Sequence, residues 1–151
     1  MQRSAKPKNP KSRRGKSNIK KLVLLICMVD QKIVDRVLKV YEDAWINQDP
    51  EKILTIFTKD AIYRERAFEK PFVGHKQIKE YWQSKVVEEQ SDIRFKLLHV
   101  YIDGNTVLAE WEASFYSNIE NARINIIEVA ILEFEGDKIK SLREYWHSKK
   151  V

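Results

Sequence analysis

The first part of the chain carries apolar residues at the spacing of helices. This pattern predicts three helices, over residues 30–47, from Pro50 onward, and over residues 76–89. Asp49 is expected to cap the second of them, because an aspartate followed by a proline is typical of a helix start. Between the second and third helices, residues 58–60 are expected to turn and residues 61–66 to be extended.

Beyond Ser91 the apolar positions alternate with polar ones, which is typical of half-buried strands. The alternation predicts four strands, over residues 95–103, 106–117, 123–134 and 138–147. Short turn sequences such as Asp103-Gly104-Asn105 separate the strands and favour antiparallel hairpins. Helices followed by an antiparallel meander indicate the α+β class.

Four short stretches stand out along this order of elements. They are Tyr41-x3-Trp45-x3-Asp49, Phe57–Tyr63, Gly74-x3-Ile78-x2-Tyr81-Trp82 and Lys138-Ile139-x3-Arg143–Trp146. In this order they resemble the SnoaL-like group of the nuclear transport factor 2-like superfamily, which includes the ketosteroid isomerases. The resemblance runs from about Val34 to His147. It implies a cystatin-like cone, in which three N-terminal helices pack on a curled antiparallel sheet that encloses an apolar pocket.

The same resemblance suggests catalytic positions. Ketosteroid isomerases move a proton with a carboxylate base and stabilise the oxyanion with a tyrosine and a protonated aspartate. Within the motifs of the family, the tyrosine matches Tyr41 and the base matches Glu65, whereas the oxyanion acid falls on Ala130. The missing acid argues against a true ketosteroid isomerase. It leaves other proton-transfer chemistry open, with Glu65 as the base and Tyr41 as a hydrogen-bond donor.

Strand alternation adds two further carboxylates to the expected pocket. Glu128 shares a face of its strand with Ala130, and Glu144 shares a face of the last strand with Trp146. Glu128 is therefore a third candidate catalytic residue. The expected ligand-binding residues are Trp45, Tyr63, Trp82, Trp111, Leu142, Glu144 and Trp146.

Each of these residues also has a purely structural interpretation. Tyr41 on an apolar helix face fits a core tyrosine, and Glu65 fits an exposed ion pair with its neighbouring arginines. Glu128 could pair with Arg123 or Arg66 inside the sheet. The four tryptophans fit the core and the wall of a pocket equally well.

The formal charge of +6 comes from the N-terminal segment alone. Nine of the 28 basic residues precede Leu22, which leaves 19 basic against 22 acidic residues from Met28 onward, a net charge of −3. A nucleic-acid interface needs a basic face on the folded domain, so none is expected. The eight-residue apolar run Leu22–Val29 is far shorter than the ~20 residues that span a bilayer, so no membrane segment is expected either.

The N-terminal segment itself leaves several interpretations open. Residues 1–29 are expected to be a disordered basic tail, or residues 1–27 an upstream extension ahead of a start at Met28. A membrane-surface anchor, an exported form and a nucleic-acid-binding tail are further alternatives, although no signal-peptide cleavage site precedes Asp30. The domain itself is expected over residues 30–151, in a cytoplasmic protein.

Metal and cofactor chemistry is not expected. The single cysteine, Cys27, excludes a cysteine-based zinc site, and the three histidines lack the paired spacing of metal ligands. The four glycines form no phosphate-binding loop.

These observations favour a domain that binds a small, mostly apolar molecule, without catalysis or with vestigial catalysis. The alternative is a cofactor-independent isomerase or cyclase that uses a pocket carboxylate as general base. The Asp-Arg-Asp arrangement of the limonene-type epoxide hydrolases is not found in the sequence. A homodimer through the outer face of the sheet is expected, because Ile127, Val129 and Ile131 form an apolar face opposite Glu128.

Overall fold

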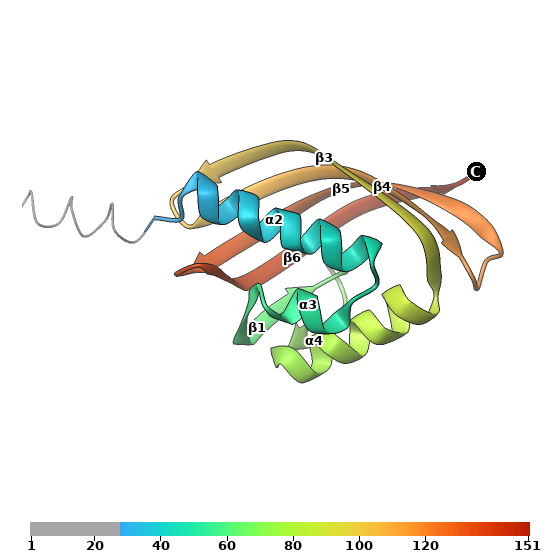
Figure 1. The fold of residues 1–151 in the computed structure, drawn as a ribbon, viewed down its shortest axis with the longest axis horizontal. Coiled ribbons are helices and arrows are strands. Elements are labelled where there is room, and N and C mark those ends of the chain that lie inside the picture. The colour runs from blue at the N-terminus through green and yellow to red at the C-terminus, as the bar shows by residue number, and fades with distance from the viewer. Residues whose placement is uncertain (1–27) are drawn as a thin grey trace, which may run out of the picture.

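The computed structural model describes residues 28–151 (Figure 1). The basic tail expected over residues 1–29 therefore lies outside the described residues except for its last two positions. Val29 is already buried, and its N–H donates to the side chain of Asn105 at 2.9 Å. The described chain thus enters the core immediately before its first helix.

Helical elements come first along the described chain, and four long strands follow them. The elements are α2 (Gln31–Ile46), α3 (Pro50–Leu54), β1 (Phe57–Arg64), β2 (Phe72–Val73), α4 (Gly74–Trp82), the π-helical turn η1 (Gln83–Glu88), β3 (Gln90–Asp103), β4 (Thr106–Ser117), β5 (Ala122–Glu135) and β6 (Lys138–Lys150). The strands form one sheet in the order β2-β1-β6-β5-β4-β3. The long strands arch over α2, and α3 and α4 lie beside β1 on the same side (Figure 1).

The sheet is antiparallel except at one pair of strands. β3, β4, β5 and β6 form the predicted meander, whereas β1 runs parallel to β6. The predicted α+β cone, with helices packed on a curled sheet, is confirmed, and the sheet is mixed. The parallel pair matters for the site, because it places Tyr63 of β1 opposite Leu142 of β6.

Both N-terminal helices begin where side-chain capping predicts. Asp30 accepts a hydrogen bond from the N–H of Ile33 at 2.8 Å, and Asp49 accepts from the N–H groups of Glu51 and Lys52 at 3.0 and 2.9 Å. α2 then buries one face, made of Val34, Val37, Leu38, Tyr41, Ala44 and Trp45. Each fully buried aliphatic side chain of this kind contributes roughly 1.5–3 kcal/mol to stability.

Two predictions of local structure were wrong. Residues 58–60 do not turn but lie within β1, at a place where the register of β1 against β6 shifts between Phe57 and Ile62. Such an irregularity tolerates polar residues within a strand. In the sequence, these polar residues look like a turn. The third helix begins at Gly74 rather than at residue 76, and its last part, from Gln83, is π-helical.

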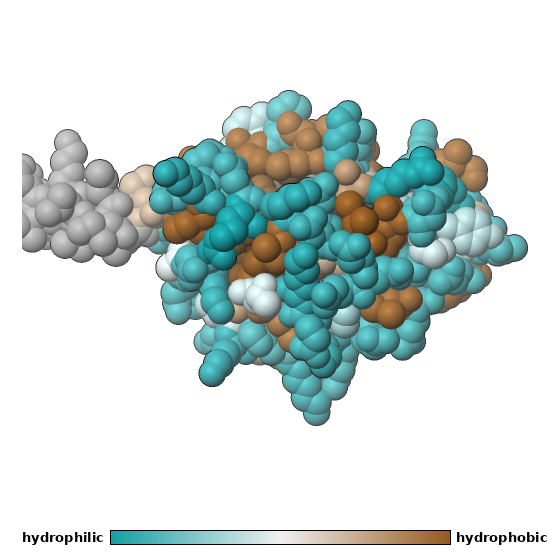
Figure 2. All heavy atoms as spheres, viewed as in Figure 1, coloured by the Kyte–Doolittle hydropathy of each residue, from teal (hydrophilic) through white to brown (hydrophobic). Residues whose placement is uncertain are grey.

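The surface carries mainly hydrophilic side chains, with separate hydrophobic groups between them (Figure 2). Some apolar side chains on the sheet are half exposed, among them Ile127 at 50% and Tyr145 at 48%. Within residues 28–151, no helix is long and apolar enough to cross a membrane.

Candidate functional site

A cavity of about 210 Å³ opens between the helices and the concave face of the sheet. It is smaller than the ~300–1,000 Å³ of sites for drug-sized ligands, so it suits a small molecule. Its aromatic walls come from α2, α4, β1, β4 and β6. They are Tyr41, Trp45, Tyr63, Tyr81, Trp82, Phe115 and Trp146. Five glutamate side chains also line this cavity, and three of them, Glu65, Glu128 and Glu144, are ones that the sequence predicts there.

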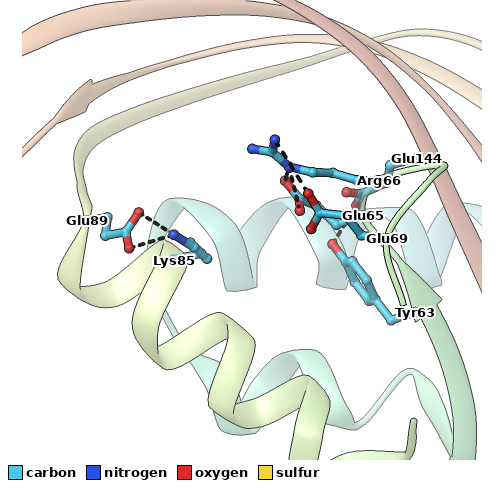
Figure 3. Close-up of polar contacts among 7 residues, drawn as sticks. All are labelled: Tyr63, Glu65, Arg66, Glu69, Lys85, Glu89 and Glu144. Carbon is cyan, nitrogen blue, oxygen red and sulfur yellow. Dashed lines mark hydrogen bonds and ion pairs between the residues drawn. The ribbon is translucent and has the colours of Figure 1, made fainter. Parts of the chain in front are cut away.

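Glu144 on β6 is the centre of a buried hydrogen-bond cluster. The hydroxyl of Tyr41 on α2 donates to Glu144 Oε1 at 2.9 Å, and the hydroxyl of Tyr63 on β1 donates to the same oxygen at 2.5 Å (Figure 3). The two hydroxyl oxygens are 3.2 Å apart. The pairing of β1 with β6 and the packing of α2 under the sheet bring these three side chains together.

Burial dominates the protonation of this cluster. Removal from water raises the pKa of Glu144 from 4.5 to about 8, although the bonds from both tyrosines oppose the increase. The negative charge of Glu65 adds to it. Burial and the charge of Glu144 raise the pKa of Tyr41 and Tyr63 well above 10, so both remain hydrogen-bond donors. A pKa near 8 favours the protonated form of Glu144 at neutral pH.

Glu144 lies beside the position at which the ketosteroid isomerase resemblance places its acid. That position is Ala130 on β5, and Ala130 is the direct partner of Glu144 across the β5–β6 pair. Directly paired residues point to the same face of a sheet, with Cβ atoms roughly 4.5–5.5 Å apart. The Glu144 side chain therefore starts only about 5 Å from the position that the resemblance assigns to the acid.

Glu128 on β5 is the second buried carboxyl, with 3% of the residue exposed. Its direct neighbours across the sheet are Trp111 on β4 and Trp146 on β6. Burial first, and then repulsion from Glu144, raises the pKa of Glu128 well above its usual value. The indole N–H of Trp111 lies beside the Glu128 carboxyl and opposes this increase, although the two atoms fall short of full hydrogen-bond geometry.

The predicted alternative for Glu128, an ion pair with Arg123 or Arg66, is wrong. Arg123 pairs with Asp92, and the Nε atom of Arg66 lies 3.2 Å from a carboxyl oxygen of Glu65. Both guanidinium groups are held by other carboxylates, so neither reaches Glu128.

Glu65 follows the end of β1 at the edge of the cavity. Its carboxyl is paired with Arg66 (Figure 3), as the structural interpretation of this residue expected. Its side chain is nevertheless only 19% exposed. The guanidinium carbon of Arg66 lies 5.3 Å from the ring centre of Trp146, a cation–π geometry. Burial raises the pKa of Glu65, and the charge of Arg66 opposes the increase.

A second ion pair lies apart from Glu65, on the helical side of the cavity (Figure 3). Lys85 Nζ on η1 is 2.8 Å from a carboxyl oxygen of Glu89. π-helical turns widen a helix and are frequent at functional sites. Here η1 contributes Lys85 and Val86 to the cavity wall.

Comparison with known proteins places this fold and cavity in a family. Residues 37–142 match the model of the SnoaL-like domain. The chain belongs to the SnoaL-like domain family. No curated protein matches its sequence.

Solved structures share the SnoaL-like fold at low sequence identity. The epoxide hydrolase/cyclase-like enzyme SalBIII of pyran ring formation in salinomycin has a TM-score of 0.70 at 21% identity, over 81% of this chain and 98% of that one. A LEH-like epoxide hydrolase of M. tuberculosis has a TM-score of 0.62 at 17% identity, over 74% and 80% of the two chains. A hypothetical protein of Catenulispora acidiphila with a ketosteroid isomerase-like fold, in complex with trimethylamine, has a TM-score of 0.65 at 19% identity, over 72% and 83%.

Most of the predicted site residues surround the SnoaL-like cavity. Those that line it are Tyr41, Trp45, Tyr63, Glu65, Trp82, Glu128, Glu144 and Trp146. Trp111 and Leu142 do not line it, because both side chains are completely buried in the core. Leu142 shares the face of Glu144, but it lies where packed side chains fill the cone.

Sequence reasoning did not assign several residues of the cavity wall, among them Tyr81, Lys85 and Phe115. A signal for the first two existed, because they lie on the same helical face as Trp82. Phe115 gave no signal beyond its place in a strand. Within the described part of the chain, no group of three or more His, Cys, Asp and Glu side chains could hold a metal ion.

Proposed function

We propose that this SnoaL-like protein is a cofactor-independent enzyme that transfers protons on a small molecule bound in the 210 Å³ cavity. The observation that carries this proposal is the Glu144 carboxyl, one oxygen of which accepts hydrogen bonds from both Tyr41 and Tyr63. The reaction class is an isomerisation, a cyclisation or a hydrolysis that needs an acid and a base but no other reagent.

Glu144 is the proposed acid. Because Oε1 accepts from two tyrosine hydroxyls, the proton of the neutral carboxyl belongs on Oε2, which is free to donate to an oxygen of the ligand. When this proton moves to the ligand, the carboxylate that remains keeps both tyrosine hydrogen bonds. The tyrosines thus stabilise the charge that forms on Glu144 during the reaction.

Glu65 is the proposed base. It is more exposed than Glu128 and Glu144, and the charge of Arg66 favours its ionised form. Ionised Glu65 in turn helps to keep Glu144 protonated, because like charges in one cavity repel. In acid–base catalysis by two carboxyl groups, the ionised one usually acts as the base and the neutral one as the acid.

The similar structures support this proposal in general terms. Two of them are described as an epoxide hydrolase and as an epoxide hydrolase/cyclase-like enzyme. A carbonyl, epoxide or ether oxygen of a small molecule would accept a proton or hydrogen bond from Glu144. Glu65 would then remove a proton from the same molecule or from an attacking water molecule.

Exchange of the α-protons of cyclohexanone in D₂O, followed by ¹H NMR, tests the proposal without knowledge of the natural substrate. Exchange requires a base to remove the α-proton and an acid to stabilise the enolate oxygen. We expect the protein to accelerate exchange above the buffer rate, and Glu144→Gln and Glu65→Gln each to lower the acceleration by a factor of roughly 10²–10⁴. Glu135→Gln, at the exposed end of β5, is the matched control. Equal acceleration by the wild type and by Glu144→Gln contradicts the proposal, as does exchange at the buffer rate.

The second candidate is a binding protein without chemistry. The similarity to the Catenulispora acidiphila protein, which is described in complex with trimethylamine, supports the binding of a small molecule by this fold. A protein of this kind would bind small ligands in the cavity with no effect on α-proton exchange. The exchange assay therefore separates the two candidates.

A further inference from the structure

We infer that the substrate carries a basic nitrogen, and that its ammonium group binds against Glu128 in the wall of the cavity. The inference rests on the proposed function, because it specifies the substrate class for the same cavity. Neither the acid role of Glu144 nor the base role of Glu65 uses Glu128, so this buried carboxyl needs a separate explanation.

The Glu128 carboxyl lines the cavity without a cationic partner, and the residue is 3% exposed. Its Oε1 atom is fully buried beside the indole N–H of Trp111, so a ligand in the cavity does not reach that oxygen. No side chain of residues 28–151 forms an ion pair with the carboxyl. Buried carboxyls in native proteins nearly always have a charged or hydrogen-bonding partner, and a ligand that brings an N–H donor into the cavity would supply one to Oε2.

The charges of the cavity wall favour a cation over an anion. Both basic side chains of the wall are already paired, Arg66 with Glu65 and Lys85 with Glu89. Glu128 has no cationic partner among the described residues. An anionic ligand would find no unpaired cation here, whereas an ammonium group would pair with Glu128.

The walls near Glu128 are aromatic, which also suits a cation. Trp146, its direct neighbour on β6, already has the guanidinium group of Arg66 at 5.3 Å from its ring centre. Tyr41, Trp45 and Tyr81 face the same cavity from the helices. Ring faces attract ammonium groups, most strongly where water is excluded.

Protonation links binding to pH. The titratable side chains that act on Glu128 or respond to its charge are Glu144, Glu65, Tyr41 and Tyr81. Burial and the neighbouring acidic groups raise the pKa of Glu128 well above its usual value, so the empty cavity favours the neutral form of this carboxyl. An ammonium ligand reverses this preference, so Glu128 gives its proton to the solvent and the bound pair is ammonium with carboxylate. Protons are therefore released when an ammonium ligand binds, and none when a neutral ligand binds.

Isothermal titration calorimetry with benzylamine and benzyl alcohol tests the inference on the full chain. The two probes have nearly the same shape and differ in charge. Titrations near neutral pH, in phosphate and in a zwitterionic buffer of higher ionisation enthalpy, give the number of protons released. We expect benzylamine to bind at least tenfold more tightly than benzyl alcohol, with a net release of protons that benzyl alcohol does not cause. Glu128→Gln should abolish both the preference and the release, and Glu135→Gln should change neither.

The outcomes separate this inference from the proposed function. Equal affinities of the two probes, or a preference for benzylamine that survives in Glu128→Gln, overturn the inference even if Glu144→Gln abolishes α-proton exchange. A preference that depends on Glu128 supports it, even if no exchange occurs. Failure of both probes to bind overturns it as well. Thermal unfolding of Glu128→Gln, monitored by circular dichroism, confirms that the variant is folded, which we expect because the amide removes an unpaired buried acid.

Discussion

Replacing Glu144 with glutamine tests whether this carboxyl is protonated in the native protein, since the expected effect on stability follows from its pKa. The native pKa is about 8, against 4.5 for an unperturbed glutamate. Below the lower value both states hold the proton and the group has no effect. Between the two values the native state binds more protons than the unfolded state, so the free energy of unfolding falls as the pH rises.

The size of the effect follows from the slope. One proton of difference lowers the free energy of unfolding by roughly 1.4 kcal/mol per pH unit, so between about pH 5 and pH 7.5 Glu144 lowers it by about 3 kcal/mol. Glutamine keeps an oxygen that accepts from Tyr41 and Tyr63 but has no proton to lose. The difference in stability between Glu144→Gln and the wild type should therefore shift in favour of the variant by about 3 kcal/mol over this range.

Urea unfolding followed by tryptophan fluorescence measures this difference. Comparing the variant with the wild type at each pH cancels the contributions of other titrating groups, except for Glu128, which is coupled to Glu144 through repulsion. Glu135→Gln, at an exposed position, should give a curve parallel to that of the wild type. If the curve of Glu144→Gln is also parallel to that of the wild type, Glu144 is ionised at neutral pH and cannot be the proposed acid.

Two further predictions concern the fold and its assembly. Gly74→Ala should lower the free energy of unfolding by about 1–2 kcal/mol, as measured by denaturant unfolding. Gly74 has φ +76°, and an added Cβ would lie 3.2 Å from the carbonyl oxygen of Lys59. An unchanged unfolding curve would show that the backbone at this position adapts. We propose a homodimer through the outer face of the sheet, where Ile127 and Tyr145 are half exposed. Light scattering should show a dimer for the wild type and a monomer for Ile127→Lys. A monomeric wild type would contradict the proposal.

The sequence predicts the fold well because its local signals agree with one another. The apolar face of α2 and the cap at Asp49 are local features, and both are found as predicted. The turn at residues 58–60 was wrong, because a polar stretch inside an irregular strand looks like a turn. The parallel pairing of β1 with β6 joins segments far apart in the chain, and no local pattern indicates it.

The site was harder to predict than the fold for the same reason. Tyr41 and Glu144 were each assigned to the pocket, but their hydrogen bond joins residues separated by 103 positions. Which oxygens meet depends on the register of three elements, and periodicity shows only the face on which a side chain lies. Trp111 and Leu142 show the converse, since a side chain on the correct face can be too deep to reach the cavity.

The pairing of Ala130 with Glu144 bears on how relatives of this protein are recognised. A sequence alignment compares one column at a time, and in the column of Ala130 it would report a lost acid. In an antiparallel pair, a carboxyl can move to the adjacent strand and change its place in space by only about 5 Å. A search that treats the paired positions of Ala130 and Glu144 as one, and asks whether either is acidic, would find an acid in this chain. A sequence alignment finds none at the position of Ala130.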